Sequence, residues 1–243
     1  MKTVIITGSS RGIGKAAALR FAKEGGWNLV LNCSRSIEAL KDTENVIRTY
    51  PNTKVMSVTG DVSDENVVKE MFRKSREAFG NVDVVVNNAG IDYFGLIQDM
   101  DVQDWDRIMN VNVRSVFLCT REAIPQMLVR HSGSIVNVSS VWGTVGGSCE
   151  AAYSASKGAV AAFSKACARE LGTSGIRVNA LAFGAIDTSM NDRLNAEEKG
   201  ALADEIALGR MGAPEEAAEL IYQTAVLSTY LTGQVITMDG GWV

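Results

Sequence analysis

The sequence contains few of the residues that build metal sites and disulfide frameworks. It has a single histidine, His131, and four cysteines that are widely spaced, with no Cys-x-x-Cys pair. Metal centres usually combine several Cys and His ligands at short spacings, so we expect no metal site. We expect the four cysteines to be reduced and to pack as small apolar residues.

Long apolar runs and an excess of positive charge are also lacking. No stretch is apolar enough to span a bilayer, and the apolar start of the chain is too short for a signal peptide. The net charge of −4 and the pI near 5.2 provide no basic surface for nucleic acid. We therefore expect a soluble, cytoplasmic protein with no membrane or nucleic-acid partner.

What is present is an alternation of short β-branched runs and longer helical stretches in a 243-residue chain that is 46% hydrophobic and 21% charged. Strands are predicted at residues 4–6, 29–31, 54–58, 82–86, 134–138, 177–181 and 234–238, and helices at 12–25, 37–50, 64–79, 102–131 and 151–171. This order predicts an α/β fold with a doubly wound parallel sheet and helices on both faces. No linker or repeat interrupts it, so we expect a single domain over 1–243.

The segment between the first strand and the first helix is rich in glycine. It reads Thr7-Gly8-Ser9-Ser10-Arg11-Gly12-Ile13-Gly14, with Gly-x-x-x-Gly-x-Gly spacing rather than Gly-x-Gly-x-x-Gly. Glycines there permit a tight turn, and the helix N-terminus offers unpaired N–H groups to a pyrophosphate. A glycine-rich turn without a ligand is the alternative, which the rest of the chain makes less favourable.

The end of the second predicted strand bears on which dinucleotide is bound. Sites selective for NAD carry an acid there, whereas Cys33 takes that place in this chain. Arg11 and Arg35 can converge on a 2′-phosphate, although each alone would fit a solvated surface charge. The sequence therefore favours NADP(H). Asp61 and Val62 could contact the adenine, or Asp61 could be an ordinary strand-end turn residue.

Three residues form a pattern that assigns a reaction. Tyr153 and Lys157 are one helical turn apart, and Ser140 precedes Tyr153 by thirteen residues. A tyrosine hydroxyl has an unperturbed pKa of about 10, and a lysine at i+4 can favour its phenolate. Ser140, at a strand end, can hydrogen-bond the same substrate oxygen. Alone, a Tyr-x-x-x-Lys pair fits a helix surface equally well.

Together these motifs resemble the short-chain dehydrogenase/reductase family over essentially the whole chain. The resemblance is carried by Thr7-Gly8-x-x-x-Gly12-x-Gly14, Asn87-Asn88-Ala89-Gly90, Asn112, Ser140, Tyr153-x-x-x-Lys157 and Asp239-Gly240-Gly241. It implies a Rossmann-type fold, usually a homotetramer, and hydride exchange between a nicotinamide and a carbonyl or alcohol. Members that only bind dinucleotide, as sensors or scaffolds, tend to lose the tyrosine or lysine, and both are present here.

The resemblance also implies roles for individual residues. Tyr153 corresponds to the general acid, and Ser140 to the residue that polarises the substrate oxygen. Lys157 corresponds to the lysine that holds the nicotinamide ribose and lowers the tyrosine pKa. Asn112 corresponds to the asparagine that positions a water for proton relay, or it is a helix-kink amide. The implied cofactor-binding residues are Gly8, Ser10, Arg11, Gly12, Ile13, Gly14, Ser34, Arg35, Asp61, Val62, Asn88, Ala89, Gly90, Tyr153, Lys157, Gly184, Ile186 and Thr188.

One position departs from the family pattern. Phe183 stands where a proline usually precedes Gly184. Its ring either reshapes the substrate pocket or fills space, and we favour reshaping of the pocket.

Within the family, two kinds of enzyme are similar to this chain. Features such as Asn32-Cys33-Ser34-Arg35-Ser36 resemble 3-oxoacyl-acyl-carrier-protein reductases, which implies a ketone carried on acyl carrier protein. His131 and Ser174 replace the arginines that dock that carrier, although Arg130 and Arg177 are close in sequence. The segment 139–150 instead resembles the reductase of 5-aminopentanone-modified elongation factor P. In that case Glu150 could meet a substrate ammonium, unless it is a solvent-facing loop acid.

Overall fold

The computed structural model describes residues 1–243 as one parallel sheet with helices on both faces. Its seven strands lie in the order β3-β2-β1-β4-β5-β6-β7, and all six neighbouring pairs are parallel. The expected Rossmann-type doubly wound fold is confirmed. The strands are β1 Lys2–Ile6, β2 Trp27–Cys33, β3 Thr53–Thr59, β4 Val84–Asn87, β5 Gly133–Ser140, β6 Ile176–Phe183 and β7 Val235–Met238.

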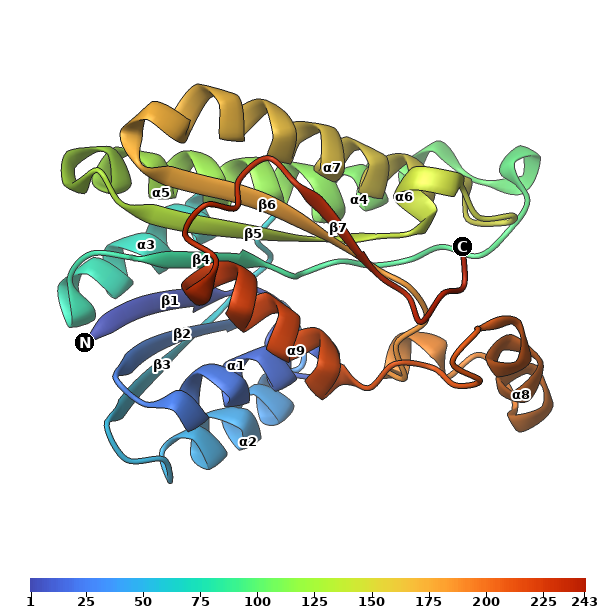
Figure 1. The fold of residues 1–243 in the computed structure, drawn as a ribbon, viewed down its shortest axis with the longest axis horizontal. Helices are drawn as coiled ribbons and strands as arrows, with labels where there is room; N and C mark the ends of the chain where they lie inside the picture. The colour runs from blue at the N-terminus through green and yellow to red at the C-terminus, as the bar shows by residue number, and fades with distance from the viewer.

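Alternate side chains of each strand enter two separate hydrophobic cores, because successive residues of a strand point to opposite faces. Ile6 packs with α1 Gly12–Glu24 and α9 Pro214–Tyr222, and α2 Ile37–Ile47 covers the same face. Ile5 packs into the other core, against α3 Glu65–Phe79, α5 Ser115–Arg130 and α7 Ala151–Leu171. Figure 1 shows the two helical layers above and below the sheet.

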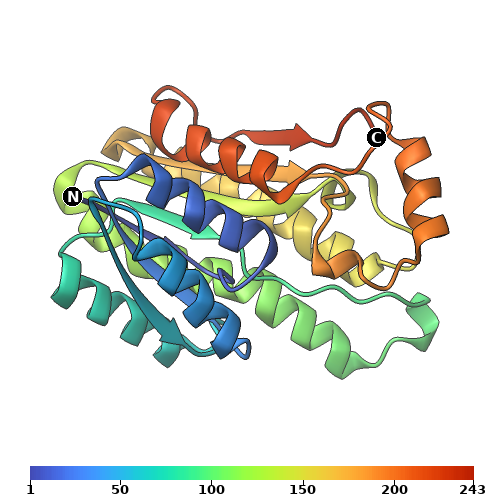
Figure 2. The same ribbon diagram turned by 90° about the horizontal axis from the view of Figure 1, so that it is seen from below.

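The strand order reverses between β1 and β4, and ligands of such sheets bind beyond the carboxyl ends of the strands at this point. The connections that leave β1, β4, β5 and β6 all emerge at that edge. The short helices α6 Trp142–Val145 and α8 Ala196–Glu205 lie there with the C-terminus (Figures 1 and 2). This end of the molecule therefore brings together the segments that hold the predicted site residues.

The single helix predicted over 102–131 is wrong in one respect. The structure has α4 Val102–Met109, a π-helical turn at Asn110–Arg114, and then α5. The side chain of Asn112 bonds to the backbone of Ile91 in a different segment. Local widening to a π turn is common at functional sites, and sequence periodicity does not detect it.

Residues 189–233, for which no helix or strand is predicted, form two helices and several short turns. Asn195 caps α8, accepting from the backbone N–H of Glu198, while Glu198 accepts from the N–H of Asn195. Pro214 opens α9, and Glu216 accepts from the N–H of Ala213. The Asn195–Glu198 capping pair and the proline at the start of α9 are both patterns that a sequence can reveal. The remaining short elements are Ile97–Asp99, Gly172–Ser174, Ser189–Asn191 and a second π turn at Gln223–Leu227.

None of the helices is both long and apolar enough to cross a membrane.

Candidate active site

Ser140, Tyr153 and Lys157 meet at the carboxyl edge of the sheet. Ser140 is the last residue of β5, and the other two lie in the first two turns of α7. The Ser140 hydroxyl acts on Tyr153 and lowers its pKa. It also accepts a 3.2 Å bond from the backbone N–H of Trp142. Its neighbour Ser139 instead donates to the carbonyl of Lys157 at 2.9 Å, which ties β5 to α7.

Lys157 is buried, with 4% of its surface exposed. Its ammonium nitrogen Nζ donates to the Val138 carbonyl at 2.9 Å and lies 5.5 Å from the centre of the Tyr153 ring. Burial lowers the pKa of Lys157 to about 8, because a charged ammonium loses its hydration there. The charge of this lysine therefore changes close to neutral pH.

The pKa of Tyr153 is raised, whereas the sequence led us to expect it to be lowered. Burial raises the pKa of its hydroxyl, Glu150 raises it further, and the hydrogen bond from Ser140 opposes the rise. The predicted lowering by Lys157 is wrong for this structure, because Nζ lies over the ring and bonds to Val138 rather than to the hydroxyl. A raised pKa keeps Tyr153 protonated at neutral pH and also makes it a weaker acid, so bound substrate and cofactor would have to stabilise its phenolate.

Asn112 lies at the π turn and is almost fully buried. Its amide accepts from the N–H of Ile91 and donates to the carbonyl of Ile91, both at 2.8 Å, and it also donates to Ser156 at 3.0 Å. Asn112 thus fixes the chain just after Gly90. A Cβ placed on Gly90 would be 3.4 Å from both Asn112 Oδ1 and Lys157 Nζ, so these groups share one small space.

The glycine-rich loop has the form that a pyrophosphate requires. Gly14 allows α1 to approach the loop closely, because a Cβ there would lie 2.3 Å from the Gly8 carbonyl oxygen. Asn88 clamps the same loop by donating to the carbonyls of Thr7 and Gly8 at 3.0 and 3.1 Å. No side chain caps α1, and its first turn has no acid. The helix N-terminus is therefore available to an anion.

The adenosine end of the site has two cations and no acid. Arg11 and Arg35 are exposed, and neither forms an ion pair. They leave adjacent strands whose ends are joined by the bond from the Ser9 N–H to the Asn32 carbonyl at 2.9 Å. Cys33 is buried in the core, so it offers no oxygen to a ribose hydroxyl. Ser10 is buried nearby, while Ile13 is partly buried and Ser34 is exposed.

Several other predicted cofactor residues have limited freedom to bind through their side chains. Asp61 accepts from the N–H of Ser63 in a tight turn, and Val62 is buried in the core, so only its backbone could meet an adenine. Ile186 is also a core residue. Thr188 lies close to Gly12, since a Cβ on Gly12 would be 3.4 Å from the Thr188 methyl group.

Phe183 fills space. Its side chain is 3% exposed and belongs to the core below the sheet, with Leu181 and Ile186. The expectation that its ring reshapes the substrate pocket is wrong, because the pleat of β6 directs the ring into the core. Gly184 follows and packs closely on Asp239, where a Cβ would meet the aspartate at 2.6 Å.

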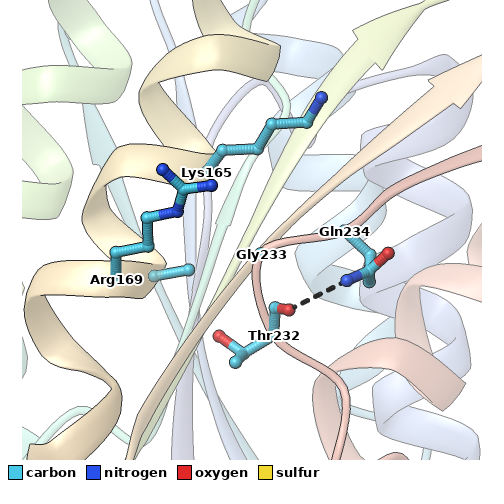
Figure 3. Close-up of a pocket in the computed structure, with 6 residues that line it drawn as sticks. Lys165, Arg169, Thr232, Gly233 and Gln234 are labelled. Atoms are coloured by element: carbon cyan, nitrogen blue, oxygen red, sulfur yellow. Dashed lines mark hydrogen bonds between the residues drawn. The ribbon is translucent and has the colours of Figure 1, made fainter.

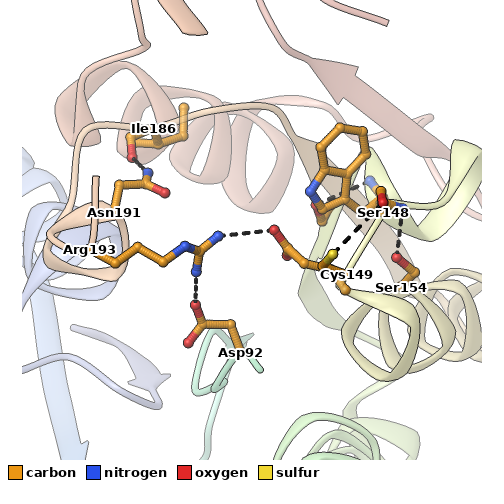
Figure 4. Close-up of polar contacts among 11 residues, drawn as sticks. Asp92, Ser148, Cys149, Ser154, Ile186, Asn191 and Arg193 are labelled. Atoms are coloured by element: carbon orange, nitrogen blue, oxygen red, sulfur yellow. Dashed lines mark hydrogen bonds and ion pairs between the residues drawn. The ribbon is translucent and has the colours of Figure 1, made fainter. Parts of the chain in front are cut away.

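A cluster that the sequence analysis did not identify lies beside Tyr153. Arg193 pairs with Asp92 at 2.6 Å and with Glu150 at 3.0 Å (Figure 4). Glu150 is thus neither an open ammonium site nor a solvent-facing loop acid, as the two readings of the sequence had it. Burial raises the pKa of Glu150, and Arg193 opposes that rise. No motif identified Arg193, because its partners are far away in sequence.

A second concavity, of about 390 Å³, is separate from this site. It is bounded by Lys165 and Arg169 of α7 and by Thr232, Gly233 and Gln234 (Figure 3). Arg169 follows Tyr153 by sixteen residues, about 24 Å along a helix that rises 1.5 Å per residue. This pocket is therefore too far from Tyr153 to hold a reacting ketone.

Comparison with known proteins decides the family. The model of the short chain dehydrogenase family matches residues 2–199. The chain belongs to that family. It is 41% identical to a 3-oxoacyl-[acyl-carrier-protein] reductase, FabG, of Thermotoga maritima, over all of this chain and 98% of the relative. It is 38% identical to a FabG of Staphylococcus aureus, over 99% of this chain and 97% of the relative. It is 36% identical to the uncharacterized oxidoreductase YmfI of Bacillus subtilis, over 99% of this chain and 98% of the relative.

As a short-chain dehydrogenase, the protein is an oxidoreductase that acts on carbonyl or hydroxyl groups with a nicotinamide dinucleotide. The glycine loop, the uncapped end of α1 and the Asn88 clamp fit the pyrophosphate of such a cofactor. The residues beyond β4, β5 and β6 would hold its nicotinamide end.

The two positions at which the resemblance implies carrier-docking arginines lie away from Ser140. His131 is two residues before β5 and Ser174 is two residues before β6, at the edge of the sheet opposite Ser140. Arg130 forms an ion pair with Asp83 at 2.6 Å, and Arg177 donates to the carbonyls of Thr224 and Ala225. Both arginines that are close in sequence are therefore already engaged within the protein.

Proposed function

We propose that this short-chain dehydrogenase is an NADPH-dependent ketone reductase with Tyr153 as its general acid. The observation that carries the proposal is the placement of the Ser140 and Tyr153 hydroxyls beside the buried Lys157. All three groups lie at the sheet edge where the glycine loop begins. The raised pKa of Tyr153 fits transfer of a proton to a ketone better than removal of one from an alcohol at neutral pH.

Each residue has a physical task in the reduction. The nicotinamide dinucleotide supplies the hydride when it is bound. Ser140 accepts from the Trp142 N–H, which leaves its single O–H to interact with Tyr153 or with the substrate oxygen. Tyr153 donates its proton to the same oxygen as negative charge develops. Lys157 provides a positive charge below pH 8, and Asn112 holds the Gly90–Ile91 backbone beside it.

The preference for NADPH is proposed from Arg11 and Arg35. Both guanidinium groups are exposed and lack carboxylate partners, and the buried Cys33 leaves no acid that could repel a 2′-phosphate. Guanidinium groups bind phosphate through paired, charge-assisted hydrogen bonds.

The proposed substrate is a 3-oxoacyl group carried on an acyl carrier protein. Its support is the identity of 38–41% with FabG proteins over the full chain. A second candidate is 5-aminopentanone-modified elongation factor P. The observation that favours it is the pair of carboxylates, Asp92 and Glu150, beside Tyr153. Because one Arg193 pairs with both, the cluster keeps a net negative charge that an aminoketone ammonium could approach, whereas a fatty acyl chain offers it no charge. By the family pattern, we further propose a homotetramer.

The test is NADPH consumption with three substrates: acetoacetyl carrier protein, acetoacetyl coenzyme A, and elongation factor P that carries 5-aminopentanone. We expect carrier-bound acetoacetate to be reduced faster than the coenzyme A thioester, by a smaller margin than carrier docking through two arginines would give. Faster reduction of the modified elongation factor would favour the second candidate. NADPH binding without oxidation of any ketone would indicate a sensor instead.

The Tyr153→Phe variant is the control for chemistry. Its ring packs in the same place and lacks only the transferable proton. We expect NADPH binding to persist while kcat falls by about 10²–10⁴-fold, the usual contribution of a general acid. A variant that kept more than about a tenth of the wild-type kcat would show that Tyr153 is not the acid.

A further inference from the structure

Arg193 joins three segments that are distant in sequence. It lies in the connection after β6, whereas Asp92 follows β4 and Glu150 immediately precedes α7. Its two ion pairs are supplemented by the face of the Phe94 ring, whose centre is 4.8 Å from the guanidinium carbon. Figure 4 shows the guanidinium between the two carboxylates.

The three charged groups are close to the reacting centre. Glu150 precedes Tyr153 by three residues, and its side chain is only 12% exposed. Asp92, Glu150 and Arg193 each act electrostatically on the Tyr153 hydroxyl. A ketone bonded to Tyr153 would therefore lie within the electrostatic influence of this cluster.

The cluster does not balance in charge. Two carboxylates share one guanidinium, which leaves one net negative charge. The surrounding segments have the same sign: residues 91–101, 141–150, 187–212 and 239–243 contain eleven acidic and three basic side chains. The whole chain has a net charge of only −4, so these segments are more acidic than the rest, although Arg11, Arg35 and Lys157 at the same edge of the sheet are basic. The acidic excess of these segments favours cationic ligands over anionic ones.

Other contacts also hold the segment that carries Arg193. Asn191 donates to the Ile186 carbonyl at 2.8 Å, and Lys199 pairs with Asp187 at 3.4 Å. At the far end of α8, Glu205 accepts a 3.2 Å bond from Trp242, whose ring packs against that of Trp142 at an interplanar angle of 56°. Replacement of Arg193 should therefore alter the charge of the entrance without releasing the segment.

We propose that Asp92, Arg193 and Glu150 form a charge filter at the substrate entrance, in which Arg193 sets how strongly the enzyme prefers a cationic ketone to an anionic one. The proposal rests on the ketone reduction proposed above and specifies the substrate charge. A neutral chain passes the filter. A carboxylate close to the carbonyl is repelled by the excess acid, and a cation in the same position is attracted.

The experiment uses three methyl ketones of matched shape. Each has three methylene groups between the carbonyl and its end group, which is trimethylammonium, tert-butyl or carboxylate. We expect kcat/KM to decrease in that order, with the cation preferred to the anion by about tenfold, near the upper end of what partly exposed charges contribute. Dissociation constants from the quenching of tryptophan fluorescence should give the same order without any turnover.

Substitutions change the net charge of the cluster in defined steps. Arg193→Gln makes it −2, Glu150→Gln or Asp92→Asn makes it zero, and the double neutralisation of both acids makes it +1. The ratio of kcat/KM for the cationic ketone to that for the anionic ketone should rise in Arg193→Gln and fall in each single neutralisation. In the double variant the anionic ketone should be preferred. Arg210→Gln is the control, because Arg210 lies in the same connection but pairs with Glu216 at 2.8 Å.

The charge filter would be overturned if the ratio of kcat/KM for the cationic to the anionic ketone did not change with the charge of the cluster. It would also be overturned if this ratio changed equally in the Arg210 control. Equal kcat/KM and equal affinity for the three ketones in the wild-type enzyme would also overturn it. Failure to reduce any of the three ketones would count against the proposed ketone reduction instead. The binding order would then still decide whether the filter exists.

Discussion

Lys157 is the only charged side chain among the buried residues of this protein. Its position beside Tyr153 combines a catalytic requirement with a cost in stability. The ammonium is removed from water and receives one backbone bond, from the Val138 carbonyl, in return. The pKa of about 8 measures this imbalance, and it leads to a prediction about stability that is independent of activity.

We expect Lys157→Met to abolish turnover and to raise the free energy of unfolding at pH 7. The folded lysine loses its proton near pH 8, while the unfolded lysine keeps it to about 10.4. The cost of burying the charge is thus fully present below pH 8 and disappears as pH rises towards the unfolded pKa. With the unpaired Val138 carbonyl offsetting part of the gain, we expect about 1–2 kcal/mol.

Urea unfolding of both proteins at pH 7 and at pH 10 checks this. The advantage of the methionine variant should be largest at pH 7 and should shrink at pH 10. A difference that grows with pH would mean that Lys157 is stabilised, and not penalised, by its surroundings.

Arg11 and Arg35 carry the cofactor preference at the residue scale. A hydrogen bond to a charged group contributes about 1.5–3 kcal/mol, so loss of either arginine should reduce the preference for NADPH over NADH by roughly tenfold to a hundredfold. Comparison of kcat/KM for the two cofactors in Arg11→Ala and Arg35→Ala measures it. Arg73→Ala, an exposed arginine on α3, is the control. A wild-type enzyme that uses NADH equally well would refute the assignment.

At the scale of elements, the π turn between α4 and α5 couples a helix to the loop after β4. The turn presents Asn112 to Ile91, whose N–H and carbonyl it satisfies together. The same loop contains Gly90, which borders Lys157, and Asp92, which belongs to the charge filter. The π turn thus helps to position both Gly90 beside Lys157 and Asp92 in the charge filter.

Asn112→Ala should lower the free energy of unfolding by about 1–3 kcal/mol, because it leaves two buried backbone groups without partners. It should also reduce kcat, since the Gly90–Ile91 backbone would no longer be fixed beside Lys157. Denaturant unfolding and steady-state kinetics measure the two effects. The exposed Asn81→Ala is the control and should stay within about 0.5 kcal/mol of wild type. An unfolding free energy as high as that of the control would show that the Asn112 bonds to Ile91 do not stabilise the protein.

At the scale of the whole molecule, the exposed apolar side chains of α4 and α5 bear on assembly. Val129 is 84% exposed, and Val102, Trp105 and Phe117 are exposed as well. Apolar groups on outer helices are candidates for contact with another copy. We predict a molar mass four times that of the 26.0 kDa chain by light scattering, and a smaller assembly for Phe117→Glu. A monomer at micromolar concentration would contradict the tetramer.

The sequence by itself determined the fold and the main features of the site. Alternating β-branched and helical segments predicted the parallel sheet, because buried parallel strands need apolar residues on both faces. The spacing of Ser140, Tyr153 and Lys157 predicted that they would meet, since a strand end and the first turns of the nearby helix face one another. These inferences depend on local geometry, which a sequence encodes directly.

Only the tertiary structure decided how the surroundings act on those residues. Whether Lys157 lowers the tyrosine pKa depends on where Nζ points, and the Val138 carbonyl decides that. Phe183 enters the core because of the pleat of β6, and Glu150 is paired because Arg193, more than forty residues later, folds back over the entrance. The pKa and the burial of a side chain depend on neighbours that the fold brings together from distant positions in the chain. The spacing of residues in the sequence does not give the distances to those neighbours.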